Sequence, residues 1–259
     1  MSRMSTEMHR AVLPALLILA GCDATQPNPI ANAQREDKPD FPKADRPVAT
    51  IVSARWSTEE ARDRLNEAEL VMDKAGIAPG MTVADIGAGE GYYTIRLAQR
   101  VGDDGRVLAE DIIPQIRDAL AHRVARERLD NVSVRLGEPD DAKLPVDSFD
   151  RVLMVHMYHE IAEPYAFLWN LRPSLRPGGR VVVVDADRRT QNHGTPPALL
   201  KCEFEAVGYR MVELQKMPSA GGYIAMFTPE GPRPEPKNIV PCRVPTPTPS
   251  AGPSGTHKG

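Results

Sequence analysis

A glycine-rich segment in the first half of the chain has the residue types and spacing of a ligand-binding loop. Residues 81–86 form an apolar run typical of a strand, and an amphipathic run at 93–101 predicts a helix. Between them glycine occupies every second position, at Gly87, Gly89 and Gly91. A strand, a glycine-rich turn and a helix in this order let backbone N–H groups approach a ligand at the positive end of the helix. Asp85 adds a carboxylate beside the turn.

The charge of this loop indicates which ligand it suits. Asp85 and Glu90 flank the glycines, and each carboxylate would repel a nearby pyrophosphate by about 1 kcal/mol or more. The spacing G-x-G-x-G also differs from the G-x-G-x-x-G of dinucleotide-binding turns, which disfavours a nicotinamide oxidoreductase. The pattern D-x-G-x-G-x-G resembles motif I of the class I S-adenosylmethionine (SAM)-dependent methyltransferases. The resemblance implies SAM as cofactor, with the glycine backbone facing its methionyl part and Asp85 on its amino side.

The elements around the loop predict an α/β fold. Five expected strands alternate with helices and an antiparallel pair follows; the strands lie at 82–86, 106–111, 131–136, 149–155, 180–185, 209–215 and 222–227. Such alternation favours a parallel sheet with right-handed crossovers, and the valine run at 180–185 is typical of a strand covered on both faces. The resemblance implies a doubly wound, Rossmann-like sheet of seven strands, mostly parallel with an antiparallel last strand, in the order 3-2-1-4-5-7-6.

Two local signals refine this outline. Ser57 and Glu60 have the spacing of a capping box, and the apolar residues after them predict a helix that ends at Gly76. Residues 176–179 carry proline and two glycines and predict a turn ahead of the fifth strand.

Acidic residues at the ends of the second and third strands are further candidate cofactor ligands. By the resemblance, Asp111 matches the residue that binds the ribose hydroxyls, since a carboxylate can accept from both of them. Glu110 is the neighbouring alternative. In the loop after the third strand, Asp141 matches the residue that accepts from the adenine amino group, with Asp140 as the second choice.

Three residues that follow the strand at 149–155 are candidate catalytic residues, namely His156, Tyr158 and His159. By the resemblance they lie beside the sulfonium methyl group, where the enzyme positions the nucleophile and sometimes deprotonates it. Either imidazole could be that base and Tyr158 could orient the substrate; alternatively, all three only line the pocket. His156-x-x-His159-Glu160 matches neither H-E-x-x-H nor H-x-x-E-H, so no metal site is predicted.

The composition indicates how far the folded domain extends and which partners it disfavours. The chain has 259 residues, 41% of them hydrophobic, and a formal net charge of −3, so no basic field favours nucleic acid. Fourteen of the 25 prolines lie in two polar segments, 27–47 and 229–253. These segments read as flexible, so we expect one folded domain at 56–229, a tether at 22–55 and a disordered tail at 230–259.

The N-terminus predicts export. A basic start, a short apolar run at 11–20 and small residues have the organisation of a secretory signal peptide at 1–21, too short to span a bilayer. Leu19-Ala20-Gly21-Cys22 resembles the lipobox of bacterial lipoproteins, which implies a lipid on Cys22 and a domain tethered to the membrane on the periplasmic side. If the segment is not an export signal, the protein is cytoplasmic.

Two cysteines remain if Cys22 carries a lipid. An oxidising envelope permits a disulfide between Cys202 and Cys242, which would pin the tail to the domain. A half-buried Cys202 and a free tail thiol are equally consistent with the sequence.

The sequence therefore predicts a SAM-dependent methyltransferase that acts on a small molecule or an envelope component. Because SAM is made in the cytoplasm, the alternative is a non-catalytic exported module of the same fold, which binds a nucleoside-like ligand or a protein partner.

Overall fold

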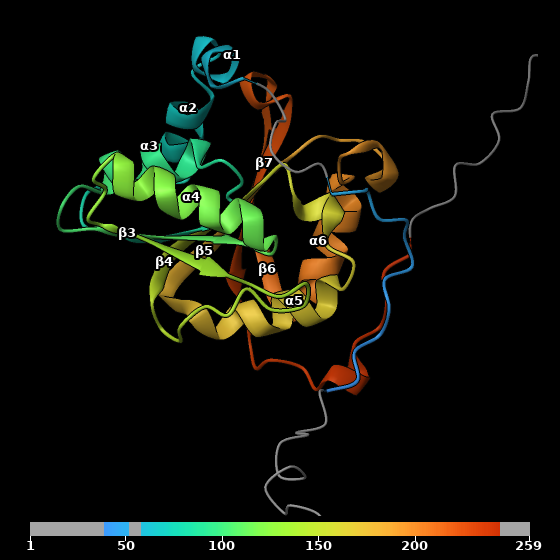
Figure 1. Ribbon diagram of the computed structural model, residues 1–259. Helices are drawn as coiled ribbons and strands as arrows, with labels where there is room; N and C mark the ends of the chain where they lie inside the picture. Colours follow the sequence, from blue (N-terminus) through green and yellow to red (C-terminus); the bar gives the residue numbers. More distant parts are fainter. Residues whose placement is uncertain (1–38, 52–57, 244–259) are drawn as a thin grey trace, which may run out of the picture. The chain divides into compact units, whose positions relative to one another are not determined.

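The computed structural model of the chain describes residues 39–51 and 58–243 (Figure 1). The predicted signal peptide and Cys22 lie outside the described residues. No helix within the described ranges is long and apolar enough to cross a membrane.

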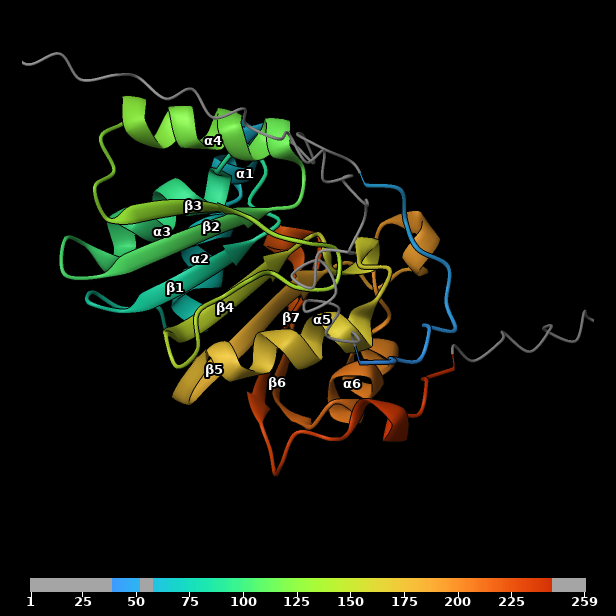
Figure 2. The same ribbon diagram turned by 60° about the horizontal axis from the view of Figure 1, so that its bottom comes forward.

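The described residues form a seven-stranded sheet in the order β3-β2-β1-β4-β5-β7-β6, as the family resemblance implies (Figure 2). β1 to β5 run parallel, whereas β7 is antiparallel to both β5 and β6. The strands are β1 (Thr82–Ile86), β2 (Arg106–Asp111), β3 (Val132–Leu136), β4 (Phe149–Val155), β5 (Leu175–Asp185), β6 (Tyr209–Met217) and β7 (Gly222–Pro229).

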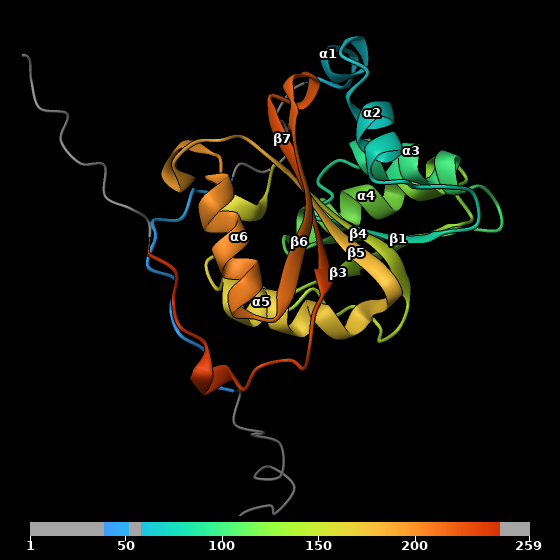
Figure 3. The same ribbon diagram turned by 180° about the vertical axis from the view of Figure 1, so that it is seen from behind.

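Helices cover both faces of the sheet (Figures 1 and 3). They are α1 (Glu59–Arg64), α2 (Glu67–Lys74), α3 (Tyr92–Val101), α4 (Pro114–Arg126), α5 (Pro164–Leu171) and α6 (Pro197–Ala206). Successive residues of a strand point to opposite faces of the sheet and belong to two hydrophobic cores. Val182 packs with α2 and α3, whereas Val181 packs with α5 and α6. The unbroken valine run of β5 is thus buried on both sides, as expected for a central strand.

The region ahead of β1 differs from the expected single helix. Asn66 has φ 53°, a left-handed conformation that separates α1 from α2. The N-cap of α1 is Thr58, whose hydroxyl accepts from the Ala61 N–H at 3.2 Å, instead of Ser57, which lies outside the described residues.

The predicted turn at 176–179 also differs, because β5 already begins at Leu175. Gly178 has φ 82°, and the register between β4 and β5 shifts opposite Phe149 and Arg151. The glycines therefore allow the backbone conformation of a bulge, so that β5 stays paired with β4 on both sides of the register shift.

Two segments beyond the predicted domain bounds pack onto it. Arg46 forms a buried ion pair with Glu203 of α6, its Nε 2.8 Å from a carboxylate oxygen. Cys202 and Cys242 form a disulfide, which resolves the open question of their pairing. Parts of the segments at 39–51 and 230–243 run side by side, joined by a bridge between Asp45 and Arg243 (Figure 3). These contacts fix both segments beside α6.

Candidate cofactor site

A cavity of about 280 Å³ lies where the carboxyl ends of β1, β2 and β4 meet. β1 pairs with β2 on one side and with β4 on the other, so the strand order reverses its direction beside β1. Ligands of open α/β sheets bind at such a reversal of strand order. The lining comes from the loops after β1, β2, β3 and β4 and from α1. The topology therefore brings at least five separate sequence segments to one site.

The glycine-rich loop forms one wall of the cavity. Gly87 and Gly89 line it with φ of 64° and 57°, and Gly91 caps α3 with φ 91°. This left-handed φ favours glycine, and a Cβ on Gly91 would also lie 2.5 Å from Leu120 Cδ1, which would have to move. The three predicted glycines thus divide into two that face the cavity and one that supports them.

Asp111 is held in the cavity by backbone groups. Its carboxylate accepts from the Gly89 N–H at 3.1 Å and from the Ile113 N–H at 2.9 Å. Burial raises the pKa of Asp111 and these N–H donors oppose the rise. A carboxylate fixed in this way is suited to accept hydrogen bonds from hydroxyl groups, which is the role predicted for the residue that binds the ribose.

Glu110, the alternative ligand, lines the same cavity. One of its oxygens is 3.4 Å from the Gly87 nitrogen, and the other, Oε1, has no hydrogen-bond partner among the described residues. Burial raises the pKa of Glu110 to about 8, and the nearby carboxylates of Asp111, Asp85 and Asp141 act in the same direction. A Cβ at Gly137 would lie 1.8 Å from Oε1, so glycine is needed there to make room for the carboxyl group.

Two predicted cofactor ligands do not line the cavity. Asp85 lies beneath the loop, where the Thr94 hydroxyl donates to it at 2.6 Å and burial raises its pKa to about 6. Asp141 accepts from the Lys143 N–H at 2.7 Å, and Lys143 Nζ lies 3.2 Å from it. From the same loop, Glu138 lines the cavity instead.

Only one of the three predicted catalytic residues lines the cavity. His156 does so, with φ 56°, and burial lowers its pKa to about 4. Tyr158 is fully buried and its hydroxyl donates to Glu203 at 2.7 Å. His159 is also fully buried, with Nδ1 facing Asp185. The turn after β4 therefore directs its side chains into different environments.

Sequence reasoning missed Arg62 of α1. Among the described residues that line the cavity, it is the only permanently charged cation. Its guanidinium lies over the Tyr92 ring at 3.8 Å and pairs with Glu67 at 2.6 Å. No spacing signal marks a single arginine on a polar helix, and only the packing of α1 against α3 brings it to the cavity.

A family model described as a methyltransferase domain matches residues 77–228, more than half of the chain. The chain belongs to the class I SAM-dependent methyltransferase family. Its cofactor is SAM, and an acidic cavity with one arginine suits a molecule that carries a sulfonium, an ammonium and a carboxylate.

Relatives and solved structures agree with this assignment. An arsenite methyltransferase of Halobacterium salinarum is 34% identical over 111 residues, 43% of this chain and 28% of that protein. A protein-L-isoaspartate O-methyltransferase of Methanothrix thermoacetophila is 31% identical over 114 residues, 44% of this chain and 51% of that protein. The chain therefore spans about half or less of these two relatives.

A solved SAM-dependent methyltransferase from Aquifex aeolicus is 25% identical to this chain. It superposes with a TM-score of 0.54 over 66% of this chain and 97% of that one. The similarity therefore extends far beyond the residues of the glycine loop.

Proposed function

We propose that the protein transfers the methyl group of SAM to a small-molecule or envelope acceptor. The observation that carries the proposal is the Asp111 carboxylate, fixed by two backbone N–H groups in a cavity walled by the glycine loop. The two relatives act, by their names, on arsenite and on isoaspartyl protein. Because these acceptors differ, they do not define the acceptor of this chain.

The lining residues divide the cavity into recognisable parts. Asp111 and Glu110 would bind the ribose hydroxyls, and Ile113 offers apolar surface to the adenine ring. The glycine loop would approach the methionyl part, and Arg62 would pair with its carboxylate. The predicted adenine contact of Asp141 remains a proposal, and Glu138 of the same loop is the better placed alternative because it lines the cavity.

SAM supplies an electrophilic methyl group when it is bound, so the chain's own residues mainly position the acceptor for in-line attack. His156 is neutral near pH 7, because burial lowers its pKa to about 4. It could take a proton from the acceptor, but so low a pKa makes it a weak base. We therefore propose that His156 chiefly shapes the acceptor pocket. Tyr158 and His159 would support it from beneath.

We also propose that the domain is anchored to the membrane through a lipid on Cys22 and faces the periplasm. The signal-like N-terminus supports this, and so does the disulfide between Cys202 and Cys242, since disulfides persist in oxidising compartments. Fractionation of cells that express wild type or Cys22→Ser tests it. Release of the variant from the membrane is expected, and an unchanged cytosolic location of both forms would contradict the proposal.

Calorimetric titration with SAM and S-adenosylhomocysteine tests the activity at its first step. Micromolar binding is expected for wild type, with a loss of about tenfold or more in Asp111→Ala, because hydrogen bonds to a charged group contribute about 1.5–3 kcal/mol. Asp118→Ala, at an exposed aspartate of α4, is the matched control and should bind as wild type does. If folded wild-type protein binds neither ligand, methyl transfer is excluded and the non-catalytic module is favoured. If it binds SAM, an acceptor screen follows.

A further inference from the structure

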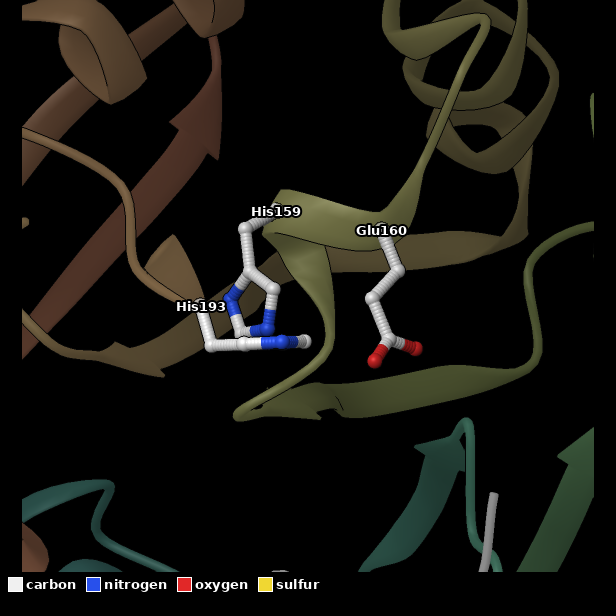
Figure 4. Close-up of side chains that lie close together, drawn as sticks. All are labelled: His159, Glu160 and His193. Atoms are coloured by element: carbon white, nitrogen blue, oxygen red, sulfur yellow. The ribbon is translucent and has the colours of Figure 1, made fainter. Parts of the chain in front are cut away.

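Three residues beside the cavity have the donor set of a metal site. One ring nitrogen each of His159 and His193 and a carboxylate oxygen of Glu160 lie within 4.8 Å of one another. His159 and Glu160 come from the 3-10 turn η2 (Tyr158–Glu160) after β4, and His193 follows the turn η4 (Thr190–Asn192) after β5. Figure 4 shows the two rings and the carboxylate gathered beneath the η2 turn.

His159 is oriented by a carboxylate, as metal-binding histidines are. Its Nδ1 lies 3.0 and 3.1 Å from the two oxygens of Asp185. Because a carboxylate only accepts, Nδ1 carries the proton and the lone pair of Nε2 faces the other way. Asp185 is itself fixed, since it accepts from the Thr195 hydroxyl at 2.7 Å and from the Ala186 N–H at 2.8 Å.

The second observation is that this lone pair has nothing to bind. His159 is fully buried, and its Nε2 has no hydrogen-bond partner within the described ranges 39–51 and 58–243. The same holds for Nδ1 of His193. A buried polar atom left without a partner costs about 1–3 kcal/mol, so such atoms in native proteins call for an explanation. A cation held by one ring nitrogen of each histidine and by the nearby carboxylate would give the buried His159 Nε2 a partner.

We propose that His159, His193 and Glu160 bind one divalent transition-metal ion, with Zn²⁺ the best match. Imidazole and carboxylate are zinc ligands, whereas Mg²⁺ and Ca²⁺ prefer all-oxygen sites. Donors within 4.8 Å of one another reach zinc–ligand distances of about 2.0–2.2 Å after a small movement of the partly exposed His193 and Glu160. Three protein ligands leave one position open, and Glu160 also lines the cofactor cavity.

The open position defines what the ion would do, and this step rests on the proposed methyl transfer. The ion would bind an ionisable oxygen, nitrogen or sulfur of the acceptor and lower its pKa, as zinc does for water. The acceptor loses its proton to solvent, and its lone pair forms the bond to the methyl carbon as the carbon–sulfur bond breaks. S-adenosylhomocysteine and the methylated acceptor are the products. The acceptor class is therefore a small molecule with an ionisable heteroatom.

Metal titration of the full-length chain, purified without a polyhistidine tag, tests the site directly. The probes are Zn²⁺ in competition with a chromogenic chelator and Co²⁺ followed by its visible absorption. Wild type should bind one equivalent of each. His193→Ala and Glu160→Gln should bind about 100-fold more weakly, and Asp185→Asn about 10–100-fold more weakly because it only orients His159. His122→Ala, at an exposed histidine of α4, is the matched control and should match wild type.

His193 is partly exposed in a loop, so its variant should remain folded, which circular dichroism verifies. Equal Zn²⁺ affinity in wild type and His193→Ala, or no specific binding by folded wild type, overturns the site. A parallel SAM titration separates the two proposals. Zn²⁺ binding without SAM binding supports the metal site and refutes methyl transfer. SAM binding without Zn²⁺ binding refutes the metal site and supports the proposed methyl transfer.

Discussion

The proposed cofactor side and the proposed acceptor side of the cavity are built from different kinds of contacts. On the cofactor side, backbone N–H groups of adjacent loops hold Asp111, and glycines provide the room. On the acceptor side, the turn after β4 is held by side chains distant in sequence, where Tyr158 bonds to Glu203 and His159 to Asp185. Backbone contacts do not depend on side-chain identity, so they suit a cofactor that a whole family shares. Side-chain contacts can be changed by single substitutions, so they suit a site that varies between members. This difference explains why the fold identifies SAM but not the acceptor.

The largest effect is expected where the acceptor side is anchored. Glu203→Ala leaves the buried Arg46 unpaired and the Tyr158 hydroxyl without its acceptor. We expect a loss of about 3–5 kcal/mol in the free energy of unfolding, measured by urea denaturation. Glu205→Ala, at a partly exposed pair with Lys201 on the same helix, should change it by no more than about 0.5 kcal/mol. Equal effects of the two variants would show that the buried pair does not anchor this side.

The disulfide is expected to contribute almost as much to stability without affecting the cofactor side. It closes a loop of 40 residues, for which loop entropy gives about 4 kcal/mol. Cys242→Ser should lower the free energy of unfolding by about 2–4 kcal/mol, while calorimetry gives a Kd for SAM within about threefold of wild type. A large loss of SAM affinity in a still-folded variant would mean that the two sides are coupled.

Glu110 makes the cofactor side sensitive to pH. Burial raises the pKa of the Glu110 carboxyl to about 8 from its ordinary value near 4.5, so the folded state keeps a proton there at pH values where the unfolded state has lost it. Its contribution to stability is therefore full below about pH 4.5 and falls as pH rises to about 8, by an amount on the order of a few kcal/mol. Glu110→Gln should lose less stability than wild type between pH 6 and 9 in urea titrations.

Bound SAM sharpens this test. A cation beside Glu110 favours the ionised carboxylate, so saturating SAM should reduce the stability that wild type loses toward pH 9. If the free energy of unfolding depends on pH in the same way in Glu110→Gln and in wild type, the pH effect belongs to another group.

The smallest effect is expected at His156. If it shapes the acceptor pocket and is not the principal base, His156→Ala should lower kcat less than about tenfold in an assay with the acceptor found by screening. The Kd for SAM should stay within about threefold of wild type. A loss of 100-fold or more in kcat at an unchanged KM would instead make His156 the base.

The sequence by itself determined the α/β class, and its resemblance to the methyltransferase family predicted the strand order and proposed the glycine loop and Asp111 as the core of the cofactor site. The periods of apolar residues predict the strands and helices, and the glycine spacing and Asp111 lie in short segments whose local conformation their own residues specify. The pairing of Cys202 with Cys242 stayed open because connectivity depends on distance in space.

Tertiary structure decided which polar side chains meet. Glu138 lines the cavity where the sequence favoured Asp141, because the loop after β3 turns its first residues inward. His193 and Asp185 reach His159 only because β4 and β5 are neighbours in the sheet. Sequence spacing reports contacts within one turn or strand, whereas contacts between strand ends depend on which strands pair. A polar cluster built from several loops is therefore visible only once the sheet is assembled.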